Sequence, residues 1–390
     1  MNRIFLKRGK EESLLRFHPW IFSGAIHHTD EKIDEGEIVK VYTYDGSFIA
    51  TGHYQQGSIA VRVLSFDEVA IDDKFWHDRL AQALRTRQVI GLVDNPLTTA
   101  YRLVHGEGDM LPGLIVDVYG HTAVMQAHSI GMHRERQLIA QQLYDVMEGR
   151  VSNIFYKSET TLPFMEPENG FIIGGNDENT ALENGLRFYV DWMSGQKTGF
   201  FVDQRDNRLL LEHYATGRNV LNMFCYTGGF SFYAMRGGAK VVHSVDSSSK
   251  ATELTRRNVE LNYPNDTRHD VFCEDAFKFL DNIQTTSYDL IVLDPPAFAK
   301  HRAALHNALK GYTRLNAKAF EKIAPRGILF TFSCSQVVTK EHFRNAVFTA
   351  AALARRKVRI LHQLHQPADH PINIYHPESE YLKGLVLYVE

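Results

Sequence analysis

The sequence predicts an α/β protein whose carboxyl-terminal half forms an open, mainly parallel β-sheet. Three observations support this fold class. Five apolar segments, spread over residues 219–335, each end in a polar or small-residue tip. Amphipathic helical patterns separate these segments, and two more apolar segments near the carboxyl end predict an antiparallel hairpin. Strands that alternate with crossover helices run in one direction, so helices are expected on both faces of the sheet.

Residues 1–71 predict a small β-rich domain. Strand patterns in residues 40–54 and 58–66 surround turns at Asp45-Gly46 and Gln56-Gly57. The start of the chain is basic, with Arg3, Lys7, Arg8, Lys10 and Arg16. On charge alone, a phosphate-binding face and a solvated terminal face are equally good interpretations.

Residues 72–190 predict an α+β middle domain. The helical pattern of residues 72–90 precedes strand patterns in residues 101–129, a helix over residues 134–147 and a further strand from Asn153. Strand-like residues near position 190 close this domain. Glu107 and Asp109 lie in its loops and are predicted to be turn residues.

Residues 191–390 contain the predicted sheet. Its parallel strands are expected to start at residue 219 and to cover residues 240–246, 269–275, 288–296 and 327–335. The clearest helical patterns cover residues 254–262 and 316–323, and residues 340–356 are amphipathic. The hairpin covers residues 358–364 and 384–390. The loop of residues 366–380 is expected to return to the active edge of the sheet, with a structural role for His370.

Chemically useful residues follow all five parallel strands. The carboxyl ends of parallel strands share one edge, where open α/β sheets bind their ligands. That edge carries the turn Tyr226, Thr227, Gly228 and Gly229, then Asp246, Asp275, Asp294 and Cys334. The two glycines allow a sharp bend and a close approach of the backbone to a ligand.

The glycine turn and two carboxylates indicate the cofactor. The turn has the sequence Y-T-G-G-F-S and lacks the G-x-G-x-x-G pattern that accommodates a pyrophosphate, which argues against NAD. Asp246 suits a ribose diol, and Asp275 suits an adenine amine. Together they predict an adenosine compound without a pyrophosphate, and S-adenosylmethionine (SAM) fits. For either carboxylate alone, a helix cap is an equally good explanation.

The fourth strand tip predicts a base-binding loop. Asp294, Pro295, Pro296 and Phe298 form a D-P-P-x-F sequence in which the prolines stiffen the backbone around the carboxylate. Such loops are common in methyltransferases that act on exocyclic amines of bases. The loop therefore favours a nucleobase substrate and leaves open which atom is methylated.

Cys334, at the fifth strand tip, favours a ring carbon as the methyl acceptor. A thiolate is a strong nucleophile, and its attack on carbon 6 of a pyrimidine makes carbon 5 able to accept a methyl group. Asp294 would hold the pyrimidine and protonate or hydrogen-bond its ring nitrogen. The alternative is an inert buried thiol, but the flanking Ser333 and Ser335 are polar. Cys273 is predicted to lie in the core, and Cys225 to pack rather than react.

Several motifs together resemble one family. LNMFCYTGGFS, VDSSSKA, DPPAFAK, LKGY, FTFSCS, KTGFFVDQR, HPWIFSGAI, QPADHP and EYLKG are similar to segments of the bacterial 23S ribosomal RNA (cytosine-5)-methyltransferases with an N-terminal PUA domain.

This resemblance covers nearly the whole chain. It implies a class I SAM-dependent methyltransferase sheet over residues 191–390, a PUA-like RNA-binding domain over residues 1–71, SAM as cofactor and large-subunit ribosomal RNA as partner. It makes Cys334 the nucleophile, with Asp246, Asp275 and Asp294 at the ribose, adenine and base positions. It adds further cofactor-binding candidates, namely Lys197, Gln204 and Arg205.

Composition narrows the remaining classes. The chain has 390 residues, 44% of them hydrophobic, and a net charge of −3, so an RNA-binding surface must be a local basic patch. The three cysteines lack the spacing of a disulfide framework or a zinc site, and no metal site is predicted. A signal peptide and membrane-spanning segments are not expected, which predicts a cytoplasmic protein. The sequence is compatible with a homodimer.

Two other functions stay open at this point. One is methylation of an exocyclic amine through the D-P-P-A-F loop, with Cys334 idle. The other is a non-catalytic RNA-binding ribosome assembly factor with a vestigial methyltransferase fold, against which the intact turn, carboxylates and thiol argue.

Overall fold

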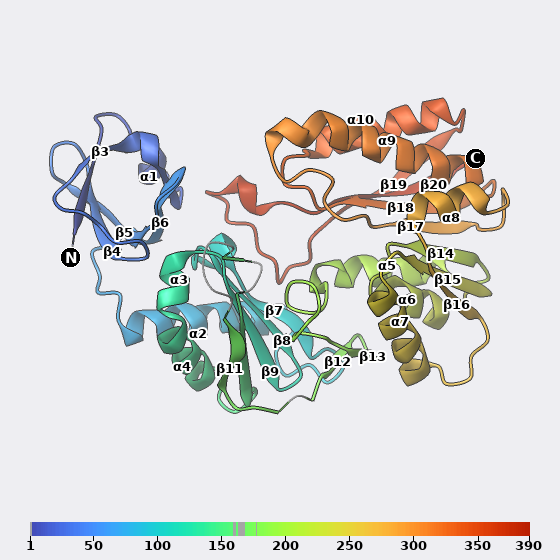
Figure 1. Ribbon diagram of the computed structural model, residues 1–390, viewed down its shortest axis with the longest axis horizontal. Coiled ribbons are helices and arrows are strands. Elements are labelled where there is room, and N and C mark those ends of the chain that lie inside the picture. The colour runs from blue at the N-terminus through green and yellow to red at the C-terminus, as the bar shows by residue number, and fades with distance from the viewer. Residues whose placement is uncertain (1, 159–160, 163–167, 177) are drawn as a thin grey trace. The chain divides into compact units, whose positions relative to one another are not determined.

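The computed structural model describes residues 2–158, 161–162, 168–176 and 178–390. The chain forms two compact units (Figure 1). The first comprises Met1–Gly185, Val190–Val202 and Ala368–Ser379, and the second comprises Leu186–Tyr189, Asp203–Pro367 and Glu380–Glu390. The division into three domains, with boundaries after residues 71 and 190, stays a prediction.

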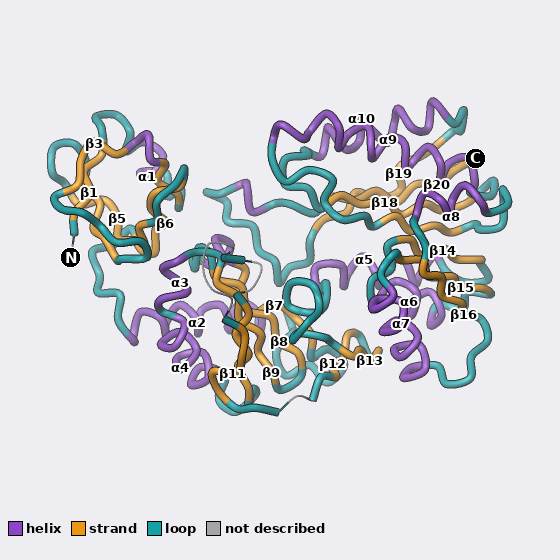
Figure 2. Tube along the Cα trace, viewed as in Figure 1, coloured by secondary structure: helices purple, strands orange, loops and turns teal. Residues whose placement is uncertain are grey.

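The amino-terminal part of the first unit is a six-stranded sheet (Figure 2). The strand order is β2-β6-β5-β4-β1-β3, and all neighbours are antiparallel except β1 and β4. Its core contains Ile4, Leu6, Val39, Val41 and Val61. Its elements are β1 (Arg3–Leu6), α1 (Glu12–Leu15), β2 (Trp20–Phe22), β3 (Ile26–Thr29), β4 (Ile38–Tyr42), β5 (Phe48–Tyr54) and β6 (Ile59–Ser65).

The rest of the first unit contains a five-stranded sheet in the order β11-β10-β9-β8-β7. Helix α2 begins after Asp72, whose side chain accepts a hydrogen bond from the Phe75 amide, and it buries Trp76 and Leu80. The elements are α2 (Asp73–Val89), β7 (Ala100–His105), η2 (Gly106–Asp109), β8 (Leu114–Tyr119), β9 (Thr122–Ala127), α3 (Ile130–Arg134), α4 (Arg136–Val146), β10 (Asn153–Lys157), β11 (Asn169–Ile173) and β12 (Thr180–Glu183).

The segment Ala368–Ser379 lies between two strands of the second unit in sequence but packs within the first unit. The guanidinium of Arg87 donates to the Asp369 carbonyl at 2.8 Å, and the Arg102 amide donates to the Asp369 carboxylate at 3.0 Å. His370 is buried beside Asp369, as expected for a structural residue. Glu107 and Asp109, predicted to be turn residues, lie in the short 3-10 helix η2, and Asp109 forms a buried ion pair with Arg87.

The second unit is a seven-stranded sheet in the order β16-β15-β14-β17-β18-β20-β19. The five predicted strands are parallel, and the predicted hairpin is antiparallel, with β20 inserted between β18 and β19. This confirms the predicted class I methyltransferase sheet. Its strands are β14 (Asn219–Met223), β15 (Val241–Asp246), β16 (His269–Cys273), β17 (Leu290–Leu293), β18 (Gly327–Ser333), β19 (Val358–His365) and β20 (Lys383–Val389), and β13 (Leu186–Tyr189) also belongs to this unit.

Helices cover both faces of this sheet. Figure 1 shows α5, α6 and α7 on one face and α8, α9 and α10 on the other. The buried core includes Leu221, Ile291, Leu315, Phe320 and Leu329. The helices are α5 (Arg205–Tyr214), α6 (Gly229–Arg236), α7 (Ser249–Asn262), α8 (Ala276–Asn282), α9 (Leu305–Lys322) and α10 (Lys340–Leu353). Within the described ranges, no helix combines the length and the apolar character needed to cross a membrane.

Candidate active site

The predicted glycine turn joins β14 to α6 with an unusual backbone. Phe224 and Tyr226 have φ values of 58° and 48°, and Gly228 has a φ of 85°. A Cβ at Gly228 would lie 2.6 Å from the Phe232 ring and 2.8 Å from the Thr255 methyl group. Position 228 therefore requires glycine on both conformational and steric grounds.

Helix α7 holds this turn in place. The Thr255 hydroxyl donates to the Tyr226 carbonyl at 2.9 Å, and the side-chain amide of Asn258 donates to the Thr227 carbonyl at 3.2 Å. Both side chains are fully buried. Sequence reasoning missed them, although a polar residue on the buried face of an amphipathic helix is a signal of such a contact.

Asp246 links the tip of β15 to the same turn. Its Oδ2 accepts from the Tyr226 amide at 3.0 Å, and its Oδ1 accepts from the Ser248 amide at 2.9 Å. Each carboxylate oxygen can accept more than one hydrogen bond, so this anchored group keeps capacity for a ligand.

Asp275 lies at the tip of β16 and is exposed. It caps α8, because its Oδ1 accepts from the Lys278 amide at 3.1 Å. The helix-cap explanation therefore applies, while the second oxygen leaves room for an adenine amine. The prediction that Cys273 lies in the core is wrong: Cys273 is exposed, because β16 is an edge strand of the sheet.

Asp294 is half-buried at the tip of β17 and contacts Gln204. The side-chain amide of Gln204 donates to Asp294 Oδ2 at 3.1 Å, and the side-chain amide of Asn207 donates to the Gln204 side-chain oxygen at 2.7 Å. Gln204 was predicted to bind cofactor, and the structure brings it to the D-P-P loop. Arg205 is buried with its guanidinium 3.3 Å from the Asp206 carboxylate.

Lys197 belongs to the first unit, where its ammonium lies 5.2 Å from the centre of the Phe201 ring. The predicted role of Lys197 in cofactor binding stays a prediction.

Cys334 follows β18 and is half-buried. Its Sγ lies 4.0 Å from the carbonyl oxygen of Pro295, so the thiol lies against the D-P-P loop. Pro295 is buried and Pro296 is exposed. Cys225, in contrast, is buried, and burial raises the pKa of its thiol, as expected for a packing residue.

Tyr312 of α9 contacts both the end of β18 around Cys334 and the D-P-P-x-F loop. Its hydroxyl bonds to the hydroxyls of Ser333 and Ser335, at 2.9 and 3.1 Å, on either side of Cys334. Its ring packs against Phe298 of the D-P-P-x-F loop in a tilted arrangement, with a centroid distance of 4.6 Å and an interplanar angle of 35°. One buried tyrosine thus contacts both the residues that flank Cys334 and the D-P-P-x-F loop.

Lys383 is a buried cation near the thiol. Its ammonium donates to the carbonyls of Ser335 and Val338, both at 2.6 Å. Burial lowers the pKa of Lys383 to about 8, although the nearby Cys334 and Glu380 act in the opposite direction. Sequence reasoning missed Lys383. The signal that could have identified it is a single lysine at the first position of an otherwise apolar strand.

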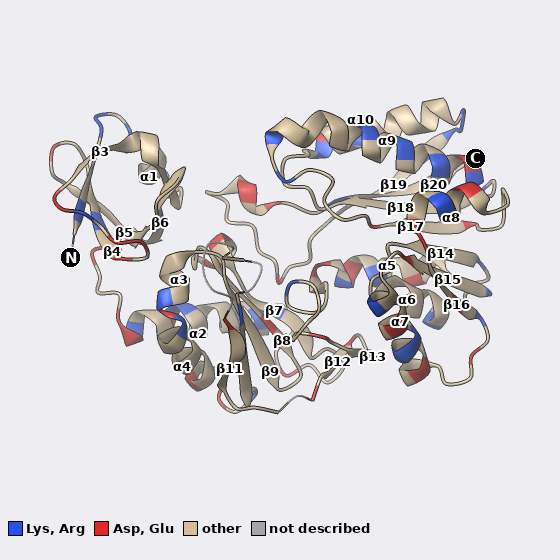
Figure 3. Cartoon of the chain, viewed as in Figure 1, with Lys and Arg blue, Asp and Glu red and all other residues tan. Residues whose placement is uncertain are grey.

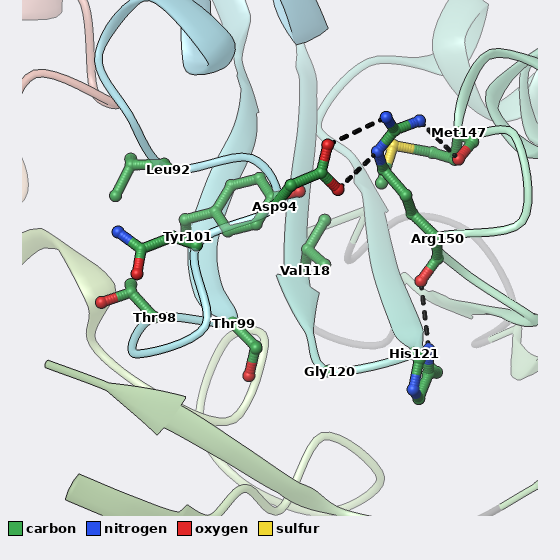
Figure 4. Close-up of a pocket in the computed structure, with 11 residues that line it drawn as sticks. Leu92, Asp94, Thr98, Thr99, Tyr101, Val118, Gly120, His121, Met147 and Arg150 are labelled. Atoms are coloured by element: carbon green, nitrogen blue, oxygen red, sulfur yellow. Dashed lines mark hydrogen bonds and ion pairs between the residues drawn. The ribbon is translucent and has the colours of Figure 1, made fainter. Parts of the chain in front are cut away.

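A separate pocket lies in the first unit (Figure 4). Tyr101, Val118 and Met147 line it, and the carboxylate of Asp94 pairs with the guanidinium of Arg150 at 2.9 and 3.0 Å. None of its lining residues is a predicted site residue, so it is not the predicted methyl-transfer site.

The arrangement at the sheet edge can support nucleophilic and acid–base chemistry. A thiol and a carboxylate lie on adjoining loops, and the ammonium group of Lys383, at the start of β20, bonds to the carbonyl next to the thiol. The neighbouring glycine turn and Asp246 suit a nucleoside cofactor.

Two family models match the chain. Residues 170–373 match the S-adenosylmethionine-dependent methyltransferase family, and residues 4–66 match a PUA-like domain. The Ribosomal RNA large subunit methyltransferase I of Aeromonas hydrophila is 41% identical over 394 residues, covering 98% of each chain.

Two solved structures share the fold over the full length of both chains. One is a Streptococcus mutans protein assigned as a SAM-dependent methyltransferase, with a TM-score of 0.85 and 23% identity. The other is a protein assigned as a methyltransferase and complexed with SAH, with a TM-score of 0.86 and 23% identity. The chain belongs to the S-adenosylmethionine-dependent methyltransferase family, with a PUA-like N-terminal domain and SAM as its cofactor.

Proposed function

We propose that this enzyme methylates carbon 5 of a cytosine in large-subunit ribosomal RNA through a covalent bond between Cys334 and the base. The observation that carries the chemistry is the position of the half-buried Cys334 thiol against the Pro295 carbonyl, on the loop that carries Asp294. The relative of Aeromonas hydrophila supports the choice of RNA, because it is named a ribosomal RNA large subunit methyltransferase.

The proposed reaction starts with the attack of the Cys334 thiolate on carbon 6 of the cytosine. A carbon–sulfur bond forms, and Asp294 supplies a proton or hydrogen bond to the ring nitrogen, so carbon 5 becomes nucleophilic. SAM, when bound, supplies the methyl group. Loss of the carbon 5 proton to a base then breaks the carbon–sulfur bond and frees Cys334.

The residues at the glycine turn fit SAM. The close backbone at Gly228 leaves no space for a side chain, and the anchored carboxylate of Asp246 suits the ribose hydroxyls. We assign Tyr226, Thr227, Gly228 and Gly229 to the cofactor as a turn, with Asp275 at the adenine. Gln204 and Arg205 are assigned to the methionine end of SAM, and Lys197 is included on the family resemblance.

The role of Asp246 can be tested by its replacement. We expect Asp246→Asn to weaken SAM binding by about 10- to 100-fold, because a charge-assisted hydrogen bond contributes about 1.5–3 kcal/mol. Isothermal titration with SAM measures the change. Asp270→Asn is the matched control, because Asp270 lies on the next strand with its side chain 72% exposed. Equal SAM affinity of Asp246→Asn and the wild type would remove Asp246 from the cofactor site.

Lys383 is proposed to favour the thiolate form of Cys334, since a nearby cation stabilises a thiolate. We expect Lys383→Gln to shift the pH–rate profile by about one pH unit towards alkaline pH. The variant and the wild type are compared below pH 8, because the pKa of Lys383 is about 8 and the wild-type side chain carries its charge there. Single-turnover rates at saturating SAM provide the measurement. Lys383→Arg should restore the profile, and the exposed Lys357→Gln should leave it unchanged. A uniformly slower rate without a pH shift would give Lys383 a structural role only.

The RNA-binding part of the proposal relies on local charge. Near the amino terminus, Lys7, Arg8, Lys10 and Arg16 are exposed, whereas Arg3 pairs with Asp30. Figure 3 marks the Lys and Arg positions of the chain in blue. Phosphate contacts need such local cations rather than a basic protein.

A cytoplasmic location belongs to the same proposal, because ribosomal RNA is the substrate. The thiol and carboxylate chemistry requires no metal ion at the methyl-transfer step.

The methylated nucleoside decides between the proposed reaction and amine methylation. We expect ribosomal RNA from cells that lack this protein to lose one 5-methylcytidine, and expression of the protein to restore it. Digestion to nucleosides followed by chromatography and mass spectrometry measures this. A change in N4-methylcytidine would instead assign the reaction to an exocyclic amine.

A further inference from the structure

Three potential metal ligands converge in the first unit, away from the residues proposed for methyl transfer. They are His18, which lies just before β2, and His376 and Glu378 from the segment Ala368–Ser379. Glu378 Oε2 lies 3.8 Å from His18 Nε2 and 3.7 Å from His376 Nε2, and all three ligand atoms lie within 4.8 Å of one another. These separations are longer than hydrogen bonds, and both lie within the distance of an ion pair between the carboxylate and a protonated histidine.

His376 gives the second observation. Its ring is 2% exposed, and its Nε2 is buried without a hydrogen-bond partner among the described residues. Leaving a buried ring nitrogen unpaired costs free energy, so the Nε2 atom of His376 indicates a partner that the described residues do not supply. Its other nitrogen, Nδ1, lies 2.8 Å from the Ser379 hydroxyl. When Nδ1–H donates to that hydroxyl, the lone pair of Nε2 points at the cluster.

The backbone of Trp20 contacts the ring of His18. The Trp20 amide donates to His18 Nδ1 at 3.2 Å, and the Trp20 carbonyl lies 3.3 Å from the same nitrogen. Binding of an ion through Nε2 would require the tautomer in which Nδ1–H donates to that carbonyl. Hydrogen bonds of this kind orient metal-binding histidines in known sites. The Trp20 ring packs on His376 at 4.3 Å between centres, and its indole N–H donates to Glu107 at 2.8 Å. The two imidazoles are therefore held by fixed neighbours.

We propose that His18, His376 and Glu378 bind a divalent transition-metal ion of the zinc class. Two imidazoles and one carboxylate form a ligand set that zinc prefers, with a fourth position left for water. Ligand atoms around tetrahedral zinc, with bonds of about 2.0–2.1 Å, lie about 3.4 Å apart. The two glutamate–histidine separations of 3.8 and 3.7 Å exceed this by a few tenths of an ångström, and the two histidine nitrogens, which lie within 4.8 Å of each other, would have to approach by up to about 1.4 Å. The Glu378 side chain is 45% exposed, which gives an ion access from solvent.

The bound ion would have a structural consequence. His18 belongs to the amino-terminal domain, whereas His376 and Glu378 belong to a segment inserted between β19 and β20. One ion would therefore cross-link the two ends of the sequence within the first unit. This inference does not depend on the proposed methyl transfer, because none of its ligands belongs to that site.

The test uses the full chain after treatment with EDTA and removal of the chelator. Titration with CoCl₂ should give one saturable site per chain with visible d–d absorption and no thiolate-to-cobalt band, and ZnCl₂ should displace the cobalt. His376→Gln and Glu378→Gln should each weaken cobalt binding by at least about tenfold, because one of three ligands is lost. The matched control is His27→Gln/His28→Gln, which removes two exposed histidines of the same domain.

A second measurement uses only the wild type. Zinc should slow hydrogen exchange of the backbone amides in residues 372–379, because the ion fixes that segment to the amino-terminal domain. Three results would overturn the proposal: no saturable cobalt binding, equal binding by His376→Gln and the wild type, or a thiolate band. Each result would leave a histidine–carboxylate cluster without a metal, and none would affect the test of the methyl-transfer site.

Discussion

Replacement of Cys334 by alanine is expected to abolish methyl transfer, with a fall of about 10⁴-fold or more, while SAM binding stays within about twofold of the wild type. The reason is that carbon 5 of cytosine is a poor nucleophile until a thiolate adds to carbon 6. SAM binding should persist because the glycine turn and Asp246 do not use the thiol. Radiolabelled methyl transfer to ribosomal RNA and a SAM titration measure the two quantities.

The cysteines offer a matched control. Cys273→Ala removes an exposed thiol from the same unit and should leave the rate unchanged. Thermal melting of both variants checks that the fold is intact. Substantial turnover by Cys334→Ala would exclude the covalent route and favour methylation of an exocyclic amine.

Replacement of Asp294 is expected to have the second largest effect. General acid catalysis contributes a factor of about 10²–10⁴ to the rate. Asp294→Asn keeps a hydrogen bond but cannot transfer a proton, so its loss of rate should lie near the lower limit. The loss of rate in Asp294→Ala should lie near the upper limit. The loss should be seen in kcat more than in the KM for SAM. Rapid-quench kinetics on ribosomal RNA provide the measurement.

Gln204 makes this experiment interpretable. An asparagine at position 294 retains a side-chain oxygen that can accept the hydrogen bond from Gln204, so the loop should keep its position. Asp281→Asn is a suitable control, since Asp281 is exposed on α8 and pairs with Lys318. An Asp294→Ala rate within about threefold of the wild type would contradict a proton-transfer role, which requires at least about 10².

The sequence predicted the sheet well because its signals are local. Each parallel strand is a short apolar run that ends in a polar residue, and the run before Asp294 is fully buried in β17. Parallel connectivity then places all the tips at one edge, so Asp246, Asp294 and Cys334 could be grouped without coordinates. The prediction that Cys273 lies in the core was wrong, because it assumed that a cysteine within a strand is buried. Strand β16 lies at the edge of the sheet, where Cys273 is exposed.

Contacts between distant residues could not be predicted in this way. Lys383 meets carbonyls of the loop after Cys334 only because β20 pairs antiparallel to β18. The ligands His18 and His376 lie near opposite ends of the sequence, so motif spacing could not reveal them. The packing of Ala368–Ser379 in the first unit depends on Asp369, whose partners Arg87 and Arg102 are equally remote in sequence.

The most direct test of the central claim is covalent trapping. Large-subunit ribosomal RNA made with 5-fluorocytidine should stall the reaction, because fluorine replaces the carbon 5 proton that must leave before the cysteine can. With SAM present, we expect a denaturant-resistant protein–RNA complex whose peptide mass places the bond at Cys334, and no complex with Cys334→Ala. Absence of the complex in the wild type, or a bond at Cys225 or Cys273, would contradict the account.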